Sequence, residues 1–393
     1  MYICIYIKHN TMIKKKLLVA AVFICSLNEL AGAQETTVIK GNVNGDLQGY
    51  KKVYLYGKGH ATDSTEIVDG HFQFTIPYEK SFIPLLYDEY SFKKLGGIRI
   101  FPILVDRPGT VEIKDINIKE GVSSGKITGI KSAEDFQDFS TQQNTLMNDV
   151  NIELQKKHGS IPAFPADGKI TPEFDAYMKE QQTLINKKLP ALMESFIKSH
   201  PDSYATIFIL SGTGVGSFDT ADLKRLFDML PKNMQQSDEG KEITNYLEGI
   251  KKSETGKPVA DFTLNNAQGK PVNFKDLKGK YILIDFWASW CGPCKQSFPH
   301  MKEIYSKFKG DKFEIYSISI DKNKPDWIKE LKAQQLPWIQ GIDDKSIAHK
   351  YFGVTAVPTT FLISPDGKII MKEIGFSQNG DMEKKLVELL ASK

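Results

Sequence analysis

The first third of the chain, residues 36–130, alternates apolar and polar positions with the period of two that is typical of half-buried strands. Residues 72–76, FQFTI, are one such run. The dipeptides Asn-Gly at 44–45 and Asp-Gly at 69–70 are turn sequences that separate the runs. This pattern predicts a small antiparallel β-domain of the sandwich type.

The apolar spacing changes to a helical period over residues 133–254. Thr171 before Pro172 is a helix start signal. Between two of the helices lies SGTGVGSF, residues 211–218, which lacks the Lys-Ser/Thr of a phosphate-binding loop, so we expect a turn there. The predicted helices are Phe136–Lys157, Pro172–Ser199, Ala221–Leu230 and Glu239–Lys252.

Strand and helix patterns alternate in the last segment, residues 255–393. A continuous apolar run at Tyr281–Trp287 indicates a buried strand, a helix is expected over Pro293–Lys309, and a second strand over Phe313–Ile320. Such alternation predicts a sheet covered by helices on both faces, with these two strands parallel and joined by a right-handed crossover. The predicted organisation is therefore a β-domain, a helical insert and an α/β domain.

The first 33 residues have the pattern of a secretory signal peptide. Lys14–Lys16 form a basic region, Leu17–Leu27 an apolar core, and Ala31–Ala33 a small-residue cleavage site. The apolar run is too short for a stable transmembrane helix. Lipoprotein anchoring through Cys25 is the alternative, although Ile24 occupies the place where a small residue is wanted.

Removal of this leader changes the charge and the thiol content. It carries four lysines and one glutamate, so 47 basic and 47 acidic residues remain, and this balance does not favour nucleic acid as a partner. It also carries Cys4 and Cys25, which leaves Cys291 and Cys294 as the remaining thiols. One pair so close in sequence is not the framework of a disulfide-stapled fold, and we expect no cofactor beyond a redox-active disulfide.

Cys291-Gly292-Pro293-Cys294 stands where the buried strand gives way to a helix. Unpaired N–H groups and the helix dipole stabilise a thiolate at a helix N-terminus, so Cys291 is the predicted nucleophile. Cys294, one turn later, can resolve a mixed disulfide on Cys291. Half of a zinc site is one alternative, but there is no second ligand pair and His300 is the one histidine nearby. A structural disulfide closing so small a loop is the other, and it would add little stability.

Asp285 is a charged residue inside the apolar strand, six positions before Cys291. Burial of a carboxylate without a partner raises its pKa. We therefore expect Asp285 to accept the proton of Cys294 during resolution, as a general base. The alternative is a buried aspartate held by structural hydrogen bonds.

Residues 255–393 resemble the thioredoxin fold, and specifically the secreted thiol-disulfide oxidoreductases of the TlpA/ResA type. The residues that carry this resemblance are FWASWCGPC at 286–294, Phe-Pro at 298–299 and Val-Pro-Thr-Thr at 357–360. The upstream β-domain and helical segment look like those that precede such modules in Bacteroidetes envelope proteins. The expected fold class is thus an α/β thioredoxin-like C-terminal domain after a small antiparallel β-sandwich-like domain and a helical segment.

The resemblance assigns roles to further residues. Pro358 would be a cis-proline beside the dithiol, and the backbone of Val357 would pair with an extended substrate segment. Trp290 would flank the nucleophile and cover it from solvent. With these we count Gly292 and Pro293 as substrate-contacting residues.

One position departs from the ResA pattern. Many ResA-like proteins carry an acidic residue three positions after the second cysteine, where this chain has Ser297. Thioredoxins instead have an aspartate at the position that matches Asp285. The resemblance therefore favours Asp285 as the proton acceptor of this chain.

The resemblance implies an exported, periplasmic protein disulfide reductase. It would receive electrons from a membrane donor and pass them to oxidised envelope proteins, for example in cytochrome c maturation. A thiol oxidase or isomerase with the same two thiols is the first alternative, and an envelope protein whose upstream half binds a partner, with an accessory redox domain, is another. The upstream segments are also candidates for a homodimer contact. A thiol peroxidase is disfavoured because Ala288 and Ile284 stand where peroxiredoxins carry Thr or Ser and Pro.

Overall fold

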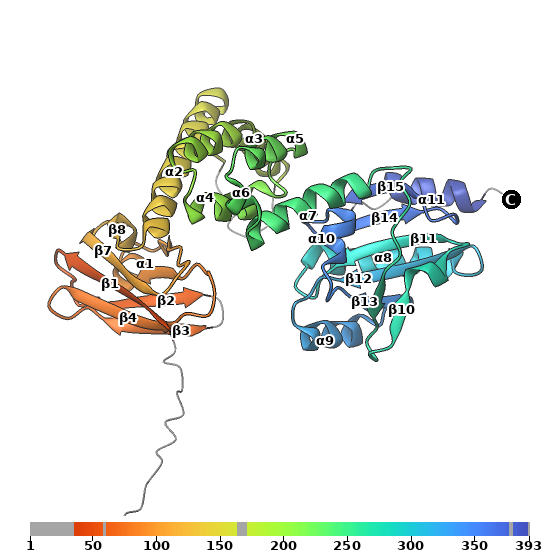
Figure 1. The fold of residues 1–393 in the computed structure, drawn as a ribbon, viewed down its shortest axis with the longest axis horizontal. Coiled ribbons are helices and arrows are strands. Elements are labelled where there is room, and N and C mark those ends of the chain that lie inside the picture. The colour runs from red at the N-terminus through yellow and green to blue at the C-terminus, as the bar shows by residue number, and fades with distance from the viewer. Residues whose placement is uncertain (1–34, 58–59, 163–170, 377–379, 392–393) are drawn as a thin grey trace, which may run out of the picture.

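The computed structural model describes residues 35–57, 60–162, 171–376 and 380–391. The leader prediction concerns residues that lie outside these ranges. Along the described part of the chain, no helix is both long enough and apolar enough to cross a membrane. Figure 1 shows a β-unit, a helical unit and a C-terminal α/β unit following one another.

The β-unit consists of two four-stranded sheets with strand orders β4-β1-β7-β8 and β3-β2-β5-β6. Alternate residues of β1 and β4 are buried, and the apolar side chains of both sheets form one core. The elements are β1 (Thr36–Asn44), β2 (Lys52–Gly57), β3 (His60–Glu66), β4 (His71–Pro77), β5 (Leu85–Asp88), α1 (Glu89–Lys93), β6 (Phe101–Pro102), β7 (Gly109–Asn117) and β8 (Lys126–Thr128). The sandwich has the expected type, but β1 and β7 pair in parallel. Alternation cannot reveal this, because a strand has the same period in either direction.

The helical unit has its own apolar core and capped helices. The Thr171 side chain accepts a hydrogen bond from the Phe174 N–H, and the Asp219 side chain accepts one from the Asp222 N–H. The helices are α2 (Lys131–His158), α3 (Pro172–Ser199), α4 (Tyr204–Ile209), a π-helical turn (Leu210–Gly214), α5 (Thr220–Asp228), α6 (Lys232–Gln235) and α7 (Asp238–Lys252). Helix α2 begins earlier than the apolar spacing indicates, because its first turn is held by Ser132, whose hydroxyl donates to Asp106 in the β-unit.

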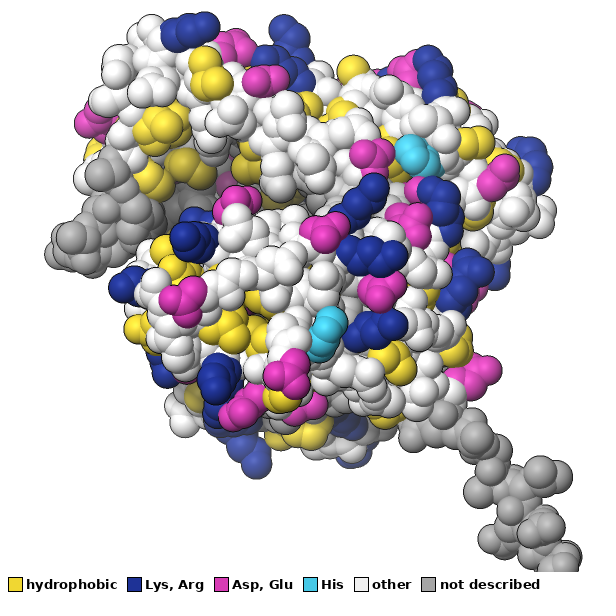
Figure 2. Space-filling view, turned by 90° about the vertical axis from the view of Figure 1, so that its left-hand side faces the viewer, with side chains coloured by type: hydrophobic (Ala, Val, Ile, Leu, Met, Phe, Trp, Pro, Cys, Tyr) yellow, Lys and Arg dark blue, Asp and Glu magenta, His cyan; other side chains and the backbone are white. Residues whose placement is uncertain are grey.

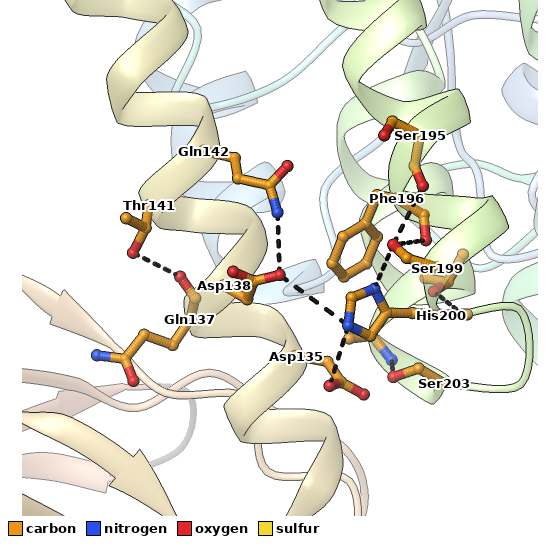
Figure 3. Close-up of polar contacts among 12 residues, drawn as sticks. Asp135, Gln137, Asp138, Thr141, Gln142, Ser195, Phe196, Ser199, His200 and Ser203 are labelled. Atoms are coloured by element: carbon orange, nitrogen blue, oxygen red, sulfur yellow. Dashed lines mark hydrogen bonds and ion pairs between the residues drawn. The ribbon is translucent and has the colours of Figure 1, made fainter.

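His200 links the end of α3 to α2, as Figure 3 shows. Its ring stacks on Phe196 with centroids 4.4 Å apart, and Nε2 lies 3.6 Å from Oδ1 of Asp135 and 4.0 Å from Oδ2 of Asp138. The hydroxyl of Ser199 lies 2.8 Å from Nδ1 of the same ring, but it also lies within hydrogen-bond distance of backbone carbonyls of its own helix. These contacts fix the packing of the two longest helices.

The C-terminal unit is built on a seven-stranded sheet of order β10-β9-β13-β12-β11-β14-β15. The strands β11, β12 and β13 are parallel, as predicted for the first two, and the other pairings are antiparallel. Its elements are β9 (Thr263–Asn265), β10 (Pro271–Asn273), β11 (Tyr281–Trp287), α8 (Gly292–Phe308), β12 (Phe313–Ser319), α9 (Lys324–Gln334), β13 (Ile339–Ile342), α10 (Ile347–Phe352), β14 (Thr359–Ile363), β15 (Ile369–Ile374) and α11 (Asp381–Ala391).

Two apolar clusters cover the two faces of this sheet. Ile282, Ile284 and Phe286 of β11 pack in the cluster that contains α10, whereas Leu283 and Trp287 pack in the cluster that contains α8, α9 and α11. Because side chains alternate along a strand, Asp285 points to the same face as Leu283 and Trp287. The fold therefore places this carboxyl beneath the helix that carries the cysteines.

Charged side chains of both signs are interleaved on the face seen in Figure 2. No broad field of one sign covers that face. This distribution agrees with the similar numbers of basic and acidic residues in the whole chain, 51 and 48.

Helix α7 packs against α10 and so connects the helical unit to the C-terminal unit (Figure 1). A methyl group built on Gly249 would lie 2.2 Å from the carbonyl oxygen of His349 and 2.7 Å from the nitrogen of Gly353. The ring Nε2 of His349 also lies 3.1 Å from the carbonyl oxygen of Glu242. The two units thus meet backbone to backbone at this point.

We expect Gly249→Ala to lower the stability of the full chain by about 1–3 kcal/mol, because the added methyl group has no room unless α7 and α10 separate. Lys241→Ala, an exposed change on the same helix, is expected to change stability by less than about 0.5 kcal/mol. Urea unfolding of both variants measures the difference. Equal stability of the two variants would show that this helix contact does not hold in solution.

Candidate active site

The dithiol lies at the junction of β11 and α8. Cys291 is the N-cap of α8, and its Sγ accepts a hydrogen bond of 3.1 Å from the backbone N–H of Cys294, to which it is joined by a disulfide bond. Pro293 stands in the first turn, where a missing N–H needs no partner. Gly292 and Pro293 are exposed, so the tip of the helix is open around the first sulfur.

Both cysteines are buried, and only the first keeps a small exposed surface. Cys291 is 4% exposed and Cys294 is fully buried. The free N–H groups at the start of α8 favour negative charge on the Sγ of Cys291 once the disulfide is reduced. The arrangement can therefore present the sulfur of Cys291 to a partner, while the sulfur of Cys294 stays buried below it.

The loop before β14 covers the dithiol from the side. The carbonyl oxygen of Val357 lies 3.6 Å from Sγ of Cys291, and the Val357–Pro358 peptide bond is cis. The carbonyl of Pro358 accepts a hydrogen bond of 2.8 Å from the N–H of Gly375, at the end of β15. The structure thus brings two predicted site residues, distant in sequence, to the nucleophile candidate.

Trp290 directly precedes the dithiol and is 67% exposed. Because Cys291 beside it is only 4% exposed, the covering of Cys291 by Trp290 stays a prediction. Ile374 and Phe376, which the sequence analysis did not single out, are 66% and 38% exposed. Because Ile374 pairs with Thr359 across two strands, these side chains flank the same loop. Phe376 also lines the cavity beside Pro358, so an exposed aromatic side chain lies on this side of the loop.

Asp285 is buried, with 1% of its surface exposed. Its Oδ2 accepts a hydrogen bond of 2.7 Å from the hydroxyl of Ser317, the residue opposite it on β12. The hydroxyl oxygen of Ser317 accepts in turn a hydrogen bond of 2.8 Å from Nε1 of Trp338. Burial raises the pKa of Asp285 to about 6, and the Ser317 hydrogen bond lowers it only in part. This carboxyl can therefore gain and lose a proton near neutral pH.

A cavity of about 60 Å³ adjoins Asp285, Ser297 and Pro358, and it has room for a water molecule. His300 and Glu383 line its far side, with His300 Nε2 3.0 Å from Glu383 Oε2. The hydroxyl of Ser297 donates to the carbonyl of Cys294 at 2.7 Å, so this side chain hydrogen-bonds within its own helix. Of the two positions weighed for a proton acceptor, Asp285 is the one that carries a carboxyl.

The sequence analysis missed Asp321, which holds the segment in front of the cysteines. Its carboxylate accepts hydrogen bonds from the N–H and hydroxyl of Ser289, at 2.9 and 2.7 Å, and from the hydroxyl of Ser319, at 2.7 Å. Asp321 follows β12 as Ser289 follows β11. The carboxyl ends of parallel neighbours meet at one sheet edge, and that was the signal available in the sequence.

A metal site was one of the alternatives for these residues. Within the described ranges, no group of three or more His, Cys, Asp and Glu side chains is placed to hold a metal ion. His300, the histidine considered as a ligand, is paired with Glu383 instead.

Comparisons with known proteins concern this part of the chain. A family model described as the AhpC/TSA family matches residues 255–372. The thiol-disulfide oxidoreductase ResA of Bacillus cereus is 33% identical over 144 residues, which are 37% of this chain and 83% of that protein. ResA of Bacillus subtilis is 34% identical over 116 residues, 29% of this chain and 64% of that protein. The thioredoxin domain of a thiol-disulfide oxidoreductase from Bacteroides vulgatus is 30% identical, with a TM-score of 0.32, over 35% of this chain and 98% of that structure.

The family model and the two ResA matches confirm the resemblance that the WCGPC and Val-Pro-Thr motifs indicated. The C-terminal unit has the thioredoxin-like fold, with the dithiol at the start of a helix that follows a buried central strand. The sequence match spans most of the Bacillus cereus relative. The chain therefore belongs to the ResA-type thiol-disulfide oxidoreductases and is an oxidoreductase enzyme.

Proposed function

We propose that this protein is an exported protein disulfide reductase. In the reduced enzyme the thiolate of Cys291 attacks one sulfur of a substrate disulfide, forms a mixed disulfide and releases the other sulfur as a thiolate. Cys294 then attacks Sγ of Cys291, which releases the reduced substrate and leaves the Cys291–Cys294 disulfide. Two electrons pass from the enzyme to the substrate, and the structure corresponds to the oxidised product.

The observation that carries this proposal is the placement of the disulfide. One sulfur lies at the helix N-terminus beside the carbonyl of Val357, and the other is buried on the face of the sheet where Asp285 lies. Asp285 takes the proton from Cys294 as this thiol attacks, with its pKa of about 6 close to the working pH. The proton acceptor and the resolving thiol thus lie on the same side of the sheet.

The substrates we propose are oxidised envelope proteins. The backbone of Val357 is available to pair with an extended substrate segment, and the exposed Trp290, Gly292 and Pro293 surround the sulfur that such a segment must reach. Export follows from the signal-peptide pattern of residues 1–33, and a membrane electron donor would regenerate the dithiol in the periplasm. No cofactor other than the dithiol takes part in the proposed reaction.

The reduction potential of the Cys291–Cys294 couple tests the direction of electron flow. We expect a value in the reducing range, near the roughly −270 mV of thioredoxin and far from the roughly −120 mV of a strong oxidant. Equilibration of the full chain with defined ratios of reduced and oxidised glutathione or dithiothreitol gives this number. A potential near the oxidising end would reverse the assignment and make the protein an oxidase or isomerase.

A further inference from the structure

The glycine-rich stretch of the helical unit is not a free surface turn. We call residues 211–217, SGTGVGS, the glycine loop. Its first four residues belong to a π-helical turn, Leu210–Gly214, a rare geometry that is frequent at functional sites. A methyl group built on Gly214 would lie 2.9–3.2 Å from side chains of the helical core, so the base of the loop is firmly packed. The glycine loop therefore has a fixed position in the helical unit.

The tip of the glycine loop reaches the C-terminal unit. Gly216 has a φ of +87°, and a methyl group built on it would lie 2.9 Å from Oγ1 and 3.2 Å from Cβ of Thr355. Thr355 stands two residues before Val357, whose carbonyl is beside the reactive sulfur. Gly216 and Thr355 are both exposed, so this contact lies at the rim of the dithiol site.

The helical unit also holds the other end of the same stretch. We call residues 353–357 the pre-proline segment. At its start, a methyl group on Gly353 would lie 2.6 Å from Cδ1 of Ile250, and the hydroxyl of Ser253 donates to the carbonyl of Phe352 at 3.0 Å. Helix α7 thus holds the segment at its first residue, and the glycine loop contacts it at its third.

We propose that the helical unit positions the pre-proline segment for peptide pairing, so that reduction of protein disulfides, unlike that of small disulfides, depends on the glycine loop. This inference rests on the proposed function. A substrate strand that pairs with Val357 advances about 3.3 Å per residue. Two residues further along, the same substrate strand therefore lies beside Thr355. A shift of about 1 Å in this backbone misaligns the pairing and with it the sulfur to be attacked.

The chemistry of the ligand follows from these contacts. Gly216, Ser217 and Thr355 offer backbone groups and hydroxyls and carry no charge. They suit the main chain of an extended, cysteine-containing protein segment. A small disulfide reaches Cys291 without contacting the pre-proline segment along its whole length, from residue 353 to residue 357. The helical unit is thereby a determinant of substrate class.

The test compares two substrates in single-turnover reactions of the full, pre-reduced chain. Gly216→Ala is expected to slow insulin reduction by about tenfold or more and to leave the rate with dithionitrobenzoate within about twofold, because only insulin needs the aligned backbone. Gly212→Ala is the matched control, since a methyl group there meets no atom within 4 Å. It is expected to leave both rates within about twofold of the unaltered chain.

A second variant separates positioning from backbone strain at Gly216. Thr355→Ala removes the two outer side-chain atoms that the new methyl group would meet, so the double variant Gly216→Ala/Thr355→Ala is expected to recover most of the insulin rate. Equal losses with both substrates, an unchanged insulin rate in Gly216→Ala, or no recovery in the double variant would overturn the inference. If the unaltered chain reduces neither substrate, the proposed function itself fails and the inference fails with it.

Discussion

Replacing Cys291 with serine is expected to abolish disulfide reduction, with a rate loss of at least about three orders of magnitude, because a hydroxyl is a far weaker nucleophile than a thiolate. Cys294→Ser should behave differently. Cys291 remains at the helix N-terminus and keeps the N–H of residue 294 as a hydrogen-bond donor to its sulfur. The first attack therefore proceeds, but the mixed disulfide cannot be resolved.

Trapping of partners by Cys294→Ser is the measurement that names the substrates. The variant is expressed in the native cell, and disulfide-linked species are separated under non-reducing conditions and identified after reduction. Cys291→Ser is the control and should trap nothing, because Cys294 is fully buried. Trapping by Cys291→Ser at a level equal to that of Cys294→Ser would show that the roles of the two cysteines are reversed.

The replacement of Asp285 with asparagine is expected to stabilise the protein at neutral pH by about 3 kcal/mol. In the unfolded chain this carboxyl has its ordinary pKa of 3.8, and burial raises it to about 6 in the folded state. Folding therefore carries a penalty above pH 6, where a buried carboxyl must ionise, and a shift of one pKa unit corresponds to about 1.4 kcal/mol. The amide removes this penalty and can still accept the hydrogen bond from Ser317.

The pH dependence gives the sign of this effect. Below about pH 3 both states hold the proton, so Asp285→Asn should gain little stability. Between the unfolded pKa of 3.8 and the folded pKa of about 6, the folded state binds more protons than the unfolded state. The unaltered protein therefore loses stability as the pH rises through this range. The free energy of unfolding of the variant should exceed that of the unaltered protein by about 1 kcal/mol at pH 4.5 and by about 3 kcal/mol at pH 8. Urea unfolding of both oxidised proteins at these two pH values measures this difference. A gain that does not change with pH would contradict a raised pKa.

Kinetics supply the functional half of the same prediction. Asp285→Asn should slow the resolution of the mixed disulfide by about 10²-fold near pH 7, the scale of a lost general base, while the first attack by Cys291 stays nearly unchanged. The rate profile should also lose the inflection near pH 6. An unchanged profile would return Asp285 to the role of a buried structural carboxyl.

Asp321→Asn is the matched control for Asp285→Asn. It is the same chemical change at a buried aspartate at the end of the adjacent strand, but this carboxylate accepts three hydrogen bonds and an amide nitrogen would face donors there. We expect Asp321→Asn to destabilise the protein by about 1–3 kcal/mol. Stability changes of opposite sign in the two variants would show that the hydrogen bonds of the carboxyl, and not its burial alone, determine the change in stability.

Much of the site could be read from local sequence. The apolar run that ends at Trp287 and the proline after Cys291 predict a strand followed by a helix start, and the structure has β11 and α8 there. A single acidic residue within that run identified Asp285 as a buried carboxyl, and it is 1% exposed. These features depend on the period of a strand and the geometry of a helix end, which nearby residues set by themselves.

Other parts of the site depend on elements that are distant along the chain. Ser317 faces Asp285 because β11 and β12 pair in one register, and Asp321 meets Ser289 at the shared end of those strands. Pairing and packing of distant segments leave no period in a single sequence. The parallel order of β11 and β12 could be read from it, but the register that gives each side chain its partner could not.

By itself, the sequence determined that the Cys-Gly-Pro-Cys dithiol begins a helix and that a buried carboxyl lies in the strand before it. The tertiary structure decided which groups surround the dithiol: Ser317 on Asp285, the Val357 carbonyl beside Cys291, and the glycine loop against Thr355. The physical reason is that strand period, turn chemistry and helix caps are local, whereas the partners of a site are set by how complete sheets and helices pack.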